Sequence, residues 1–302
     1  MYLKNSIYEP YIPPRLKKFF NEHENIINKI FNILKNYKKN IIDSFYYSIE
    51  NPPIHPNYKY TDKLYLGCIL FIIKHGSTWE SFLGPISGKQ LNKRHHEYLK
   101  YNLYSEFYES ILEEYLKNHD VKYLSIDSTI INNKNCTELV KHHPCNKNRK
   151  GIKISTIVDD IGSPLNTFIM ESTNHDTKIA QNNINELINS KIINNTLKRT
   201  KGYPYLLGDS GYDSNDIREK LKKAGYKTII KPNNKNNKYK RKKKIKKRNH
   251  KQYQKRIKVE HFFAIIKKYP KINCIYEKKI KSFNGLVLFL FGAILINRNN
   301  ET

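Results

Sequence analysis

The order of the apolar segments after residue 121 constrains the fold of this chain more than any other sequence feature. Three short segments rich in apolar and β-branched residues come first, and two more follow, each preceded by a stretch with helical spacing. The expected strands are Lys122–Asp127, Ile152–Val158, Leu165–Met170, Tyr203–Asp209 and Lys227–Lys231, and the expected helices are Thr177–Ser190 and Ser214–Ala224. A turn at 159–164 makes the second and third strands a hairpin. The order predicts an α/β fold with a mixed five-stranded sheet and helices on both faces.

This order of elements is typical of ribonuclease-H-like domains, so we assign residues 121–302 to one such domain, with a basic insertion at 232–252. Residues 1–60 predict a helical lead-in. Residues 61–120 predict an N-terminal helical, helix-turn-helix-like DNA-binding domain, because short helical patterns alternate with tight turns. Its expected helices are Lys63–His75, Trp79–Leu83, Lys89–Tyr101 and Tyr104–Leu116.

Basic residues point to a polyanionic partner. Lys and Arg total 55 against 27 Asp and Glu, for a formal charge of +28. This charge is spread over a chain with 23 Tyr and 13 Phe, which favours nucleic acid over a membrane surface. An AT-rich genome explains part of the excess equally well. Lys93 and Arg94, on one expected helix, are candidate DNA contacts, although a solvated helix face accounts for them too.

The segment 231–258 holds fifteen Lys or Arg and no acidic residue, including Lys240, Arg241, Lys242, Lys243 and Lys244. It leads directly into the helix that carries Glu260. We interpret it as a segment that binds the DNA backbone, while a nuclear localisation signal or a solubilising loop remain alternatives.

Cysteine usage and hydropathy bound the compartment. Four cysteines in 302 residues do not make a disulfide scaffold, and the first residues lack the apolar core of a signal peptide. The apolar run Gly285–Ile296 is shorter than the roughly 20 residues that span a bilayer, so it predicts a buried helix and no membrane partner. The expected location is intracellular and with DNA, either cytoplasmic in a prokaryote or in a nucleus or viral factory.

Three carboxylates stand where chemistry is expected. Asp127 ends the first expected strand and Asp209 ends the fourth, and ligands of open α/β sheets collect at the carboxyl ends of strands. Glu260 belongs to an expected amphipathic helix, 254–269. At about 100° per residue, Tyr253, Arg256, Glu260 and Lys267 share one face of that helix. A surface ladder of ion pairs is the alternative explanation of this face.

These motifs resemble those of DDE transposases from bacterial insertion sequences of the four/five superfamily. The string Tyr253-x2-Arg256-x3-Glu260-x6-Lys267 matches that family's signature around its catalytic glutamate. Asp127-Ser128-Thr129 resembles the first aspartate motif, and 208–214 resembles the second. The resemblance extends over roughly residues 60–298 in the same order.

The resemblance implies a metal-dependent DNA transposase. Asp127, Asp209 and Glu260 would be the catalytic residues and the ligands of two Mg²⁺ or Mn²⁺ ions, since hard divalent cations prefer oxygen ligands. Tyr253, Arg256 and Lys267 would bind DNA phosphates near the transposon end. The partners implied are double-stranded DNA, as transposon ends and target, and further copies of the chain assembled on DNA. A nuclease of the same fold and an inactive, transposase-derived DNA-binding protein are the alternatives.

Two further clusters are weighed beside this site. Asp176, in His175-Asp176, is expected to cap the following helix, with an auxiliary catalytic role as the alternative. Cys136, His142, His143 and Cys145 share one loop with zinc-capable side chains, but the spacing matches no paired zinc knuckle. Zinc at this loop stays open.

Overall fold

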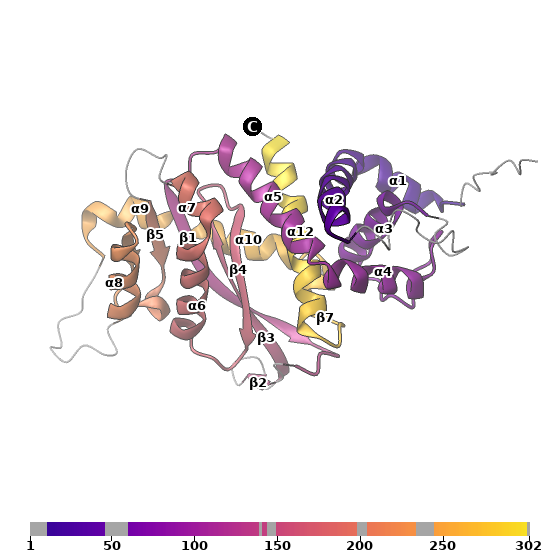
Figure 1. Ribbon diagram of the computed structural model, residues 1–302. Coiled ribbons are helices and arrows are strands. Elements are labelled where there is room, and N and C mark those ends of the chain that lie inside the picture. Colours follow the sequence, from indigo (N-terminus) through magenta and orange to yellow (C-terminus); the bar gives the residue numbers. More distant parts are fainter. Residues whose placement is uncertain are drawn as a thin grey trace, which may run out of the picture.

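A group of N-terminal helices lies beside a sheet that is covered by helices (Figure 1). The computed structural model describes residues 11–45, 60–138, 141–143, 149–197, 204–233 and 245–300. Lys240–Lys244 and Cys145, which the sequence singles out, lie outside the described residues, and so do the side chains of His142 and His143.

The sheet has the ribonuclease-H-like topology expected from the sequence. Its five main strands follow the order β4-β3-β1-β5-β6; β1, β3 and β4 are antiparallel, whereas β5 and β6 join β1 in parallel. Two short strands that the sequence did not predict extend it, β2 beside β3 and β7 beside β1. The strands are β1 Tyr123–Asn133, β2 Lys141–His143, β3 Arg149–Val158, β4 Pro164–Glu171, β5 Tyr205–Gly208, β6 Lys227–Ile230 and β7 Cys274–Ile275.

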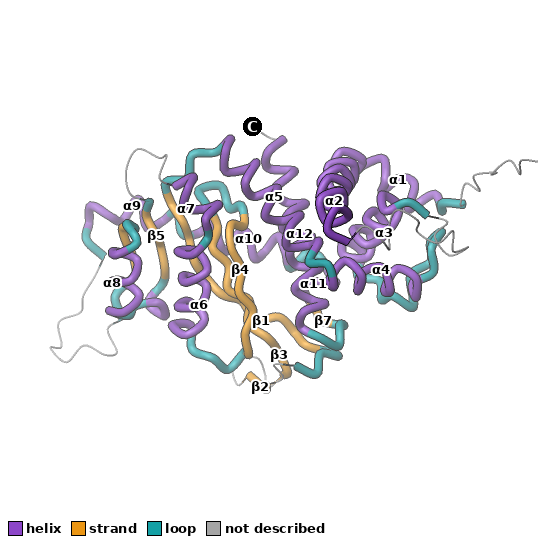
Figure 2. Tube along the Cα trace, in the orientation of Figure 1, coloured by secondary structure: helices purple, strands orange, loops and turns teal. Residues whose placement is uncertain are grey.

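Helices cover both faces of the sheet, as predicted. Alternate side chains of a strand point to opposite faces. On one face, Lys153 and Ser155 of β3 bond to Asp176 and Asn183 of α6 (Asp176–Asn189). The other face carries Asp127, which bonds to the residue just before α10 (Ile257–Ile266). The two helices can be followed against the strands in Figure 2. Further elements on this domain are α7 (Lys191–Leu197), η2 (Ser210–Tyr212), α8 (Asn215–Lys223), η4 (Lys247–Asn249), α9 (His250–Gln254) and α11 (Pro270–Asn273).

The N-terminal part is helical, and one expected helix is absent from it. The helices are α1 (Pro14–Glu22), α2 (Glu24–Phe45), α3 (Asp62–His75), α4 (Gly88–Lys100) and α5 (Leu103–Asn118). The helix expected at Trp79–Leu83 is wrong, because this segment forms a turn. The hydroxyls of Thr78 and Ser81 accept each other's backbone N–H, and such side-chain bonds compete with helix formation.

Arg94 has a structural partner set. Its guanidinium lies 2.7 Å from both Asp62 and Glu97, and its side chain is only 18% exposed. It therefore ties α4 to the start of α3. Lys93, the neighbouring candidate for DNA contact, is exposed on the same helix.

The C-terminal helix α12 (Ile280–Asn300) joins the two parts of the fold. By length and hydropathy alone it is able to span a membrane, but 72% of its apolar window is buried inside the protein. It packs along α5, where Gly292 faces the ring of Phe107. Helix α5 also contacts the sheet domain, because the hydroxyls of Tyr108 and Tyr115 donate to the Pro164 carbonyl and the Asp159 carboxylate. The division of the chain at residue 120 stays a proposal, and these contacts argue for grouping α5 with the sheet.

Candidate active site

Asp127 and Asp209 each follow the last residue pair of two neighbouring parallel strands by two positions. That pair is Ser125 of β1 with Leu207 of β5, and the two carboxylates are close enough for the charge of Asp209 to act on Asp127. The prediction that Asp127 ends its strand is wrong. Strand β1 continues to Asn133 because it pairs with β3. Asp127 is instead just past the last pair with β5.

Polar groups surround the half-buried carboxylate of Asp127. The Ser128 backbone N–H donates to Oδ1 at 2.8 Å, and Nη1 of Arg256 donates to Oδ2 at 3.0 Å. The buried Tyr212 hydroxyl is 3.4 Å from Oδ1. Burial raises the pKa of Asp127, and the negative charge of Asp209 adds to the rise, whereas the Ser128 N–H and Arg256 oppose it. Burial thus disfavours the charged form of Asp127, while the Ser128 N–H and Arg256 favour it.

Asp209 begins the one-turn helix η2. Its side chain accepts a hydrogen bond from the Gly211 backbone N–H at 2.8 Å, which directs it back over the end of β5. Gly211 fits between two carboxylates, since a Cβ at this position would lie 3.1 Å from Asp209 Oδ1 and 3.3 Å from Asp176 Oδ2. A residue with a side chain at position 211 would require Asp209 and Asp176 to shift by a few tenths of an ångström.

Arg256 links Asp127 to Glu260. Its Nη2 donates to Oε1 of Glu260, one helical turn further on. The expected single helix 254–269 is in fact two helices, α9 and α10. The break at Lys255-Arg256 is held by tighter bonds, in which Arg256 N–H donates to the Tyr253 carbonyl and Val259 N–H to the Arg256 carbonyl. The break leaves Arg256 as the cap residue of α10, with its side chain aimed at the sheet.

The other two members of the helical signature differ in position. Tyr253 is half-buried beside Arg256, and burial raises its pKa, as do the nearby charges of Asp209 and Asp127. Lys267 is exposed at the C-cap of α10, and its ammonium group bonds to none of the residues described. Tyr253 therefore belongs to the carboxylate cluster, whereas Lys267 faces solvent.

Asp176 does not cap α6, which corrects the sequence expectation. The cap position is His175, and Asp176 lies in the first turn of the helix. Its Oδ1 accepts hydrogen bonds from the Ser128 hydroxyl at 2.9 Å and from Nζ of Lys153 at 3.0 Å. Asp176 thus contacts the neighbour of Asp127 and, through Gly211, borders Asp209. The sequence pattern does not predict these contacts of Asp176 with Ser128 and Lys153, although the pair His175-Asp176 singled out the residue.

The donor chemistry of these side chains suits a hard divalent cation, because Asp127, Asp209 and Glu260 offer only carboxylate oxygens. In the described part of the chain, however, no three His, Cys, Asp or Glu side chains lie close enough together to hold a metal ion. Arg256 lies between Asp127 and Glu260 and forms an ion pair with each of them. The residue types fit a metal site, and in this structure the Arg256 guanidinium lies between the carboxylates that would bind the metal.

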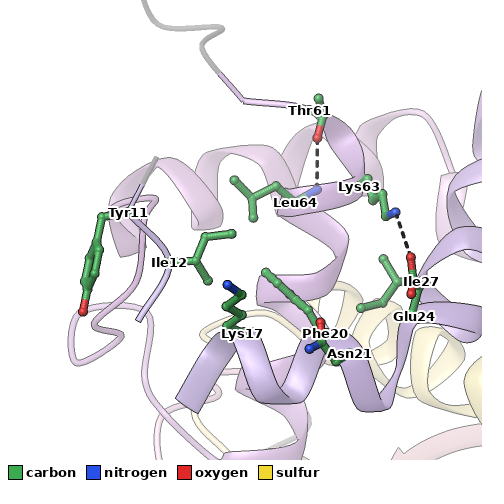
Figure 3. A pocket seen from close by; sticks show the side chains of 10 residues that line it. All are labelled: Tyr11, Ile12, Lys17, Phe20, Asn21, Glu24, Ile27, Thr61, Lys63 and Leu64. Atoms are coloured by element: carbon green, nitrogen blue, oxygen red, sulfur yellow. Dashed lines mark hydrogen bonds and ion pairs between the residues drawn. The ribbon is translucent and has the colours of Figure 1, made fainter. Parts of the chain in front are cut away.

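A separate pocket of about 700 Å³ lies among the N-terminal helices (Figure 3). The ion pair between Lys63 and Glu24, at 3.8 Å, borders it. Its lining residues are Tyr11, Ile12, Lys17, Phe20, Asn21, Glu24, Ile27, Thr61, Lys63 and Leu64. None of them belongs to the carboxylate cluster on the sheet.

The chain is similar to known proteins in sequence and in structure. The family described as "Transposase DDE domain" matches residues 122–296. No curated protein matches the chain. A similar solved structure is the piggyBac transposase in a synaptic complex with hairpin DNA, with a TM-score of 0.46, 8% identity, and coverage of 78% of this chain and 65% of that chain. A second is the pre-cleavage Mos1 transpososome, with a TM-score of 0.24, 10% identity, and coverage of 76% and 77%. The chain thus spans about two thirds of the piggyBac protein.

Proposed function

The chain belongs to the transposase DDE domain family, and on this premise we propose that it cuts DNA at the ends of a transposable element and joins the freed ends to target DNA. The observation that carries this proposal is that Asp127 and Asp209 each lie two residues past the last pair of the neighbouring strands β1 and β5, while Arg256 connects Asp127 to Glu260. Two aspartates and a glutamate provide the carboxylate oxygens with which a protein binds the divalent cations used in phosphoryl transfer on DNA.

We assign Asp127, Asp209 and Glu260 as the ligands of two Mg²⁺ or Mn²⁺ ions. When bound, such ions supply activation of the attacking oxygen and stabilisation of the leaving oxygen in phosphoryl transfer. Asp209 is held ready by the Gly211 N–H, and Asp127 by the Ser128 N–H. Glu260 is 47% exposed and sits on the first turn of α10, so its side chain has room to turn towards the aspartates.

We propose two roles for Arg256, one in the absence of cations and one when they are bound. In the structure its guanidinium neutralises Asp127 and Glu260. With divalent cations bound at those carboxylates, the guanidinium would be free to bind a DNA phosphate, for which its planar fork is suited. Tyr253, half-buried beside it, and Lys267, exposed beyond the end of α10, extend the phosphate contacts along the DNA strand.

Asp176 and Lys153 act as positioning residues in this proposal. Lys153 is 9% exposed at its side chain and neutralises Asp176, which in turn holds the Ser128 hydroxyl next to Asp127. Outer groups of this kind orient the ligands of metal sites. Lys153 thus offsets the charge of Asp176 beside the other two aspartates.

The partner we propose is double-stranded DNA, bound as transposon ends and as target, in an assembly of more than one copy of the chain inside the cell. The net charge of +28 supports DNA as the partner. Lys93, exposed on α4, is a candidate backbone contact of the N-terminal helices. Arg94 is left out of this set because Asp62 and Glu97 hold it.

The decisive experiment measures strand cleavage and joining on DNA that carries the sequences flanking the gene, in Mg²⁺. We expect Asp127→Asn, Asp209→Asn or Glu260→Gln to abolish cleavage and to leave DNA affinity nearly unchanged. Asp216→Asn is the matched control, because Asp216 is an acid on α8 whose partner is Gln181. A triad variant that still cuts end-containing DNA would contradict the assignment. Cleavage without joining would indicate a nuclease, and binding without either would indicate an inactive descendant.

The basic segment is tested separately. Replacing Lys240–Lys244 by Gln is expected to weaken binding to DNA of any sequence and to reduce the salt dependence of the binding constant, because each phosphate contact contributes about 0.9 to its logarithmic slope. An unchanged slope would favour a localisation or solubilising role for this segment.

A further inference from the structure

A row of two tyrosines and two lysines crosses the sheet on the face that carries the aspartates. Tyr123 of β1 pairs with Tyr205 of β5, and Tyr205 pairs with Lys227 of β6, so the three are direct neighbours on adjacent strands. Lys255, from the link between α9 and α10, closes the row on the side of Tyr123. We call these four residues the tyrosine–lysine row.

Ring contacts order the two lysines. The rings of Tyr123 and Tyr205 are stacked, with centroids 5.3 Å apart and planes at 21°. The ammonium of Lys255 lies 4.1 Å from the centroid of Tyr123, and that of Lys227 lies 5.2 Å from the centroid of Tyr205. Such cation–π contacts at exposed sites contribute about 0.5–1 kcal/mol each. They hold two flexible side chains in place before any ligand binds.

The row remains accessible to a ligand. Both tyrosines are partly exposed, Lys227 is exposed, and the side chain of Lys255 is 46% exposed. The acid beside the row is Asp160, whose Oδ1 is 3.8 Å from Lys255, and its other oxygen accepts the backbone N–H groups of Lys122 and Tyr123. Two ammonium groups against this one carboxylate leave the row with a positive balance.

Its distance from the carboxylates matches a DNA strand. Tyr123 precedes Asp127 by four residues of a regular strand, so both side chains point to one face and lie about 13 Å apart along β1. B-DNA carries one phosphate per strand for about every 3.4 Å of axis, so this distance is about four base pairs. A duplex with its reacting phosphate at Asp127 and its axis along β1 would therefore pass over the row.

We propose that the tyrosine–lysine row is a DNA-phosphate subsite, which binds the backbone of the duplex about four base pairs from the reacting phosphodiester. The ligand is a phosphate and not a base. The two rings cover each other's inner faces, and the lysines lie against the rings, so no free ring face is left for stacking. The two ammonium groups and the tyrosine hydroxyls offer donors to phosphate oxygens. This inference rests on the proposed function, because it takes DNA as the substrate.

The test uses the full chain and a 30-base-pair duplex of arbitrary sequence, with affinity measured by fluorescence anisotropy over a series of salt concentrations. We expect Lys227→Gln with Lys255→Gln to reduce the slope of log K against log salt by about 1.8, since each phosphate contributes about 0.9. Tyr123→Leu with Tyr205→Leu is expected to reduce it by a smaller amount, because the lysines lose their order but keep their charge. Tyr123→Phe with Tyr205→Phe retains the rings and is expected to keep most of the slope.

The matched control is Lys222→Gln with Lys223→Gln, which removes the same charge from exposed positions on α8. An equal reduction of the slope by this control would overturn the proposal, because the effect would then be one of net charge. An unchanged slope in the Lys227 and Lys255 variant would overturn it as well. Failure of the unsubstituted chain to bind the duplex would instead count against the proposed function. Circular dichroism of each variant shows that it is folded.

Discussion

Arg256 competes with divalent cations for the same carboxylates if the proposed site is right. Its Nη1 lies 3.0 Å from Asp127 Oδ2, with side chains that are 18% and 22% exposed. A hydrogen bond to a charged group in such a setting contributes about 1.5–3 kcal/mol, while the bond to the more exposed Glu260 adds little. We therefore expect Arg256→Met, which keeps the apolar stem, to lower the free energy of unfolding by about 2 kcal/mol in EDTA.

The same substitution is expected to increase the response to magnesium. In the variant, Mg²⁺ at ten times its Kd stabilises the folded chain by RT ln 11, about 1.4 kcal/mol. In the unsubstituted chain the gain is smaller, because the cation must first displace the guanidinium from Asp127. Urea unfolding followed by circular dichroism, with and without Mg²⁺, measures both effects without any DNA present.

A second arginine provides the control for this experiment. Arg218 lies 2.7 Å from Asp213, with side chains 31% and 22% exposed, and it also donates to the Ile230 carbonyl. Arg218→Met is expected to lose a similar amount of stability and to show no added response to Mg²⁺. If Mg²⁺ stabilises the Arg256→Met variant no more than the unsubstituted chain, Arg256 does not share its carboxylates with a cation and the reasoning fails.

Three further predictions concern buried groups. Burial lowers the pKa of His95 to about 3, below the 6.5 of the unfolded chain, so the unfolded chain takes up the proton first as pH falls. The stability from the neutral ring is present above pH 6.5 and is lost towards pH 3, at about 1.4 kcal/mol per pH unit, and urea unfolding should show a steeper loss for the unsubstituted chain than for His95→Gln. Gly292→Ala places a Cβ 2.3 Å from the buried ring of Phe107, so calorimetry should show a loss of about 1–3 kcal/mol despite the better helix propensity of alanine. Lys153→Met removes the cation beside Asp176 and is expected to slow cleavage about 10-fold at unchanged DNA affinity, with partial rescue by Lys153→Arg; equal rates would contradict its positioning role.

Much of the fold follows from local patterns. Each main strand and the helices α6 and α8 are visible as alternating or helical apolar residues, because burial of one face imposes that period on the chain. Patterns failed where long-range contacts decide the outcome. The extension of β1 to Asn133 depends on β3, and the two-residue strand β7 depends on the far end of β1. The turn at 78–81 replaced a helix because side-chain bonds satisfied the backbone there.

The candidate site divides in the same way. Spacing alone indicated Glu260 with Tyr253 and Arg256, since all three lie within three turns of one segment. It did not indicate the break before α10, which turns Arg256 towards a carboxylate 129 residues away. The sequence neighbours of Asp176 predict a helix cap. Its actual partners are Ser128 of β1 and Lys153 of β3, which are distant in the sequence.

The sequence by itself determined the order of the elements, the basic charge and the three carboxylates, because each of these is a property of single residues or of neighbours within a few turns. Only the tertiary structure decided that Asp127 and Asp209 follow the same end of the β1–β5 pairing, that Arg256 bridges Asp127 and Glu260, and that Tyr123, Tyr205 and Lys227 form a row. Strand register and packing set these distances between distant segments, and the local pattern of apolar residues is the same for every register that buries the same face.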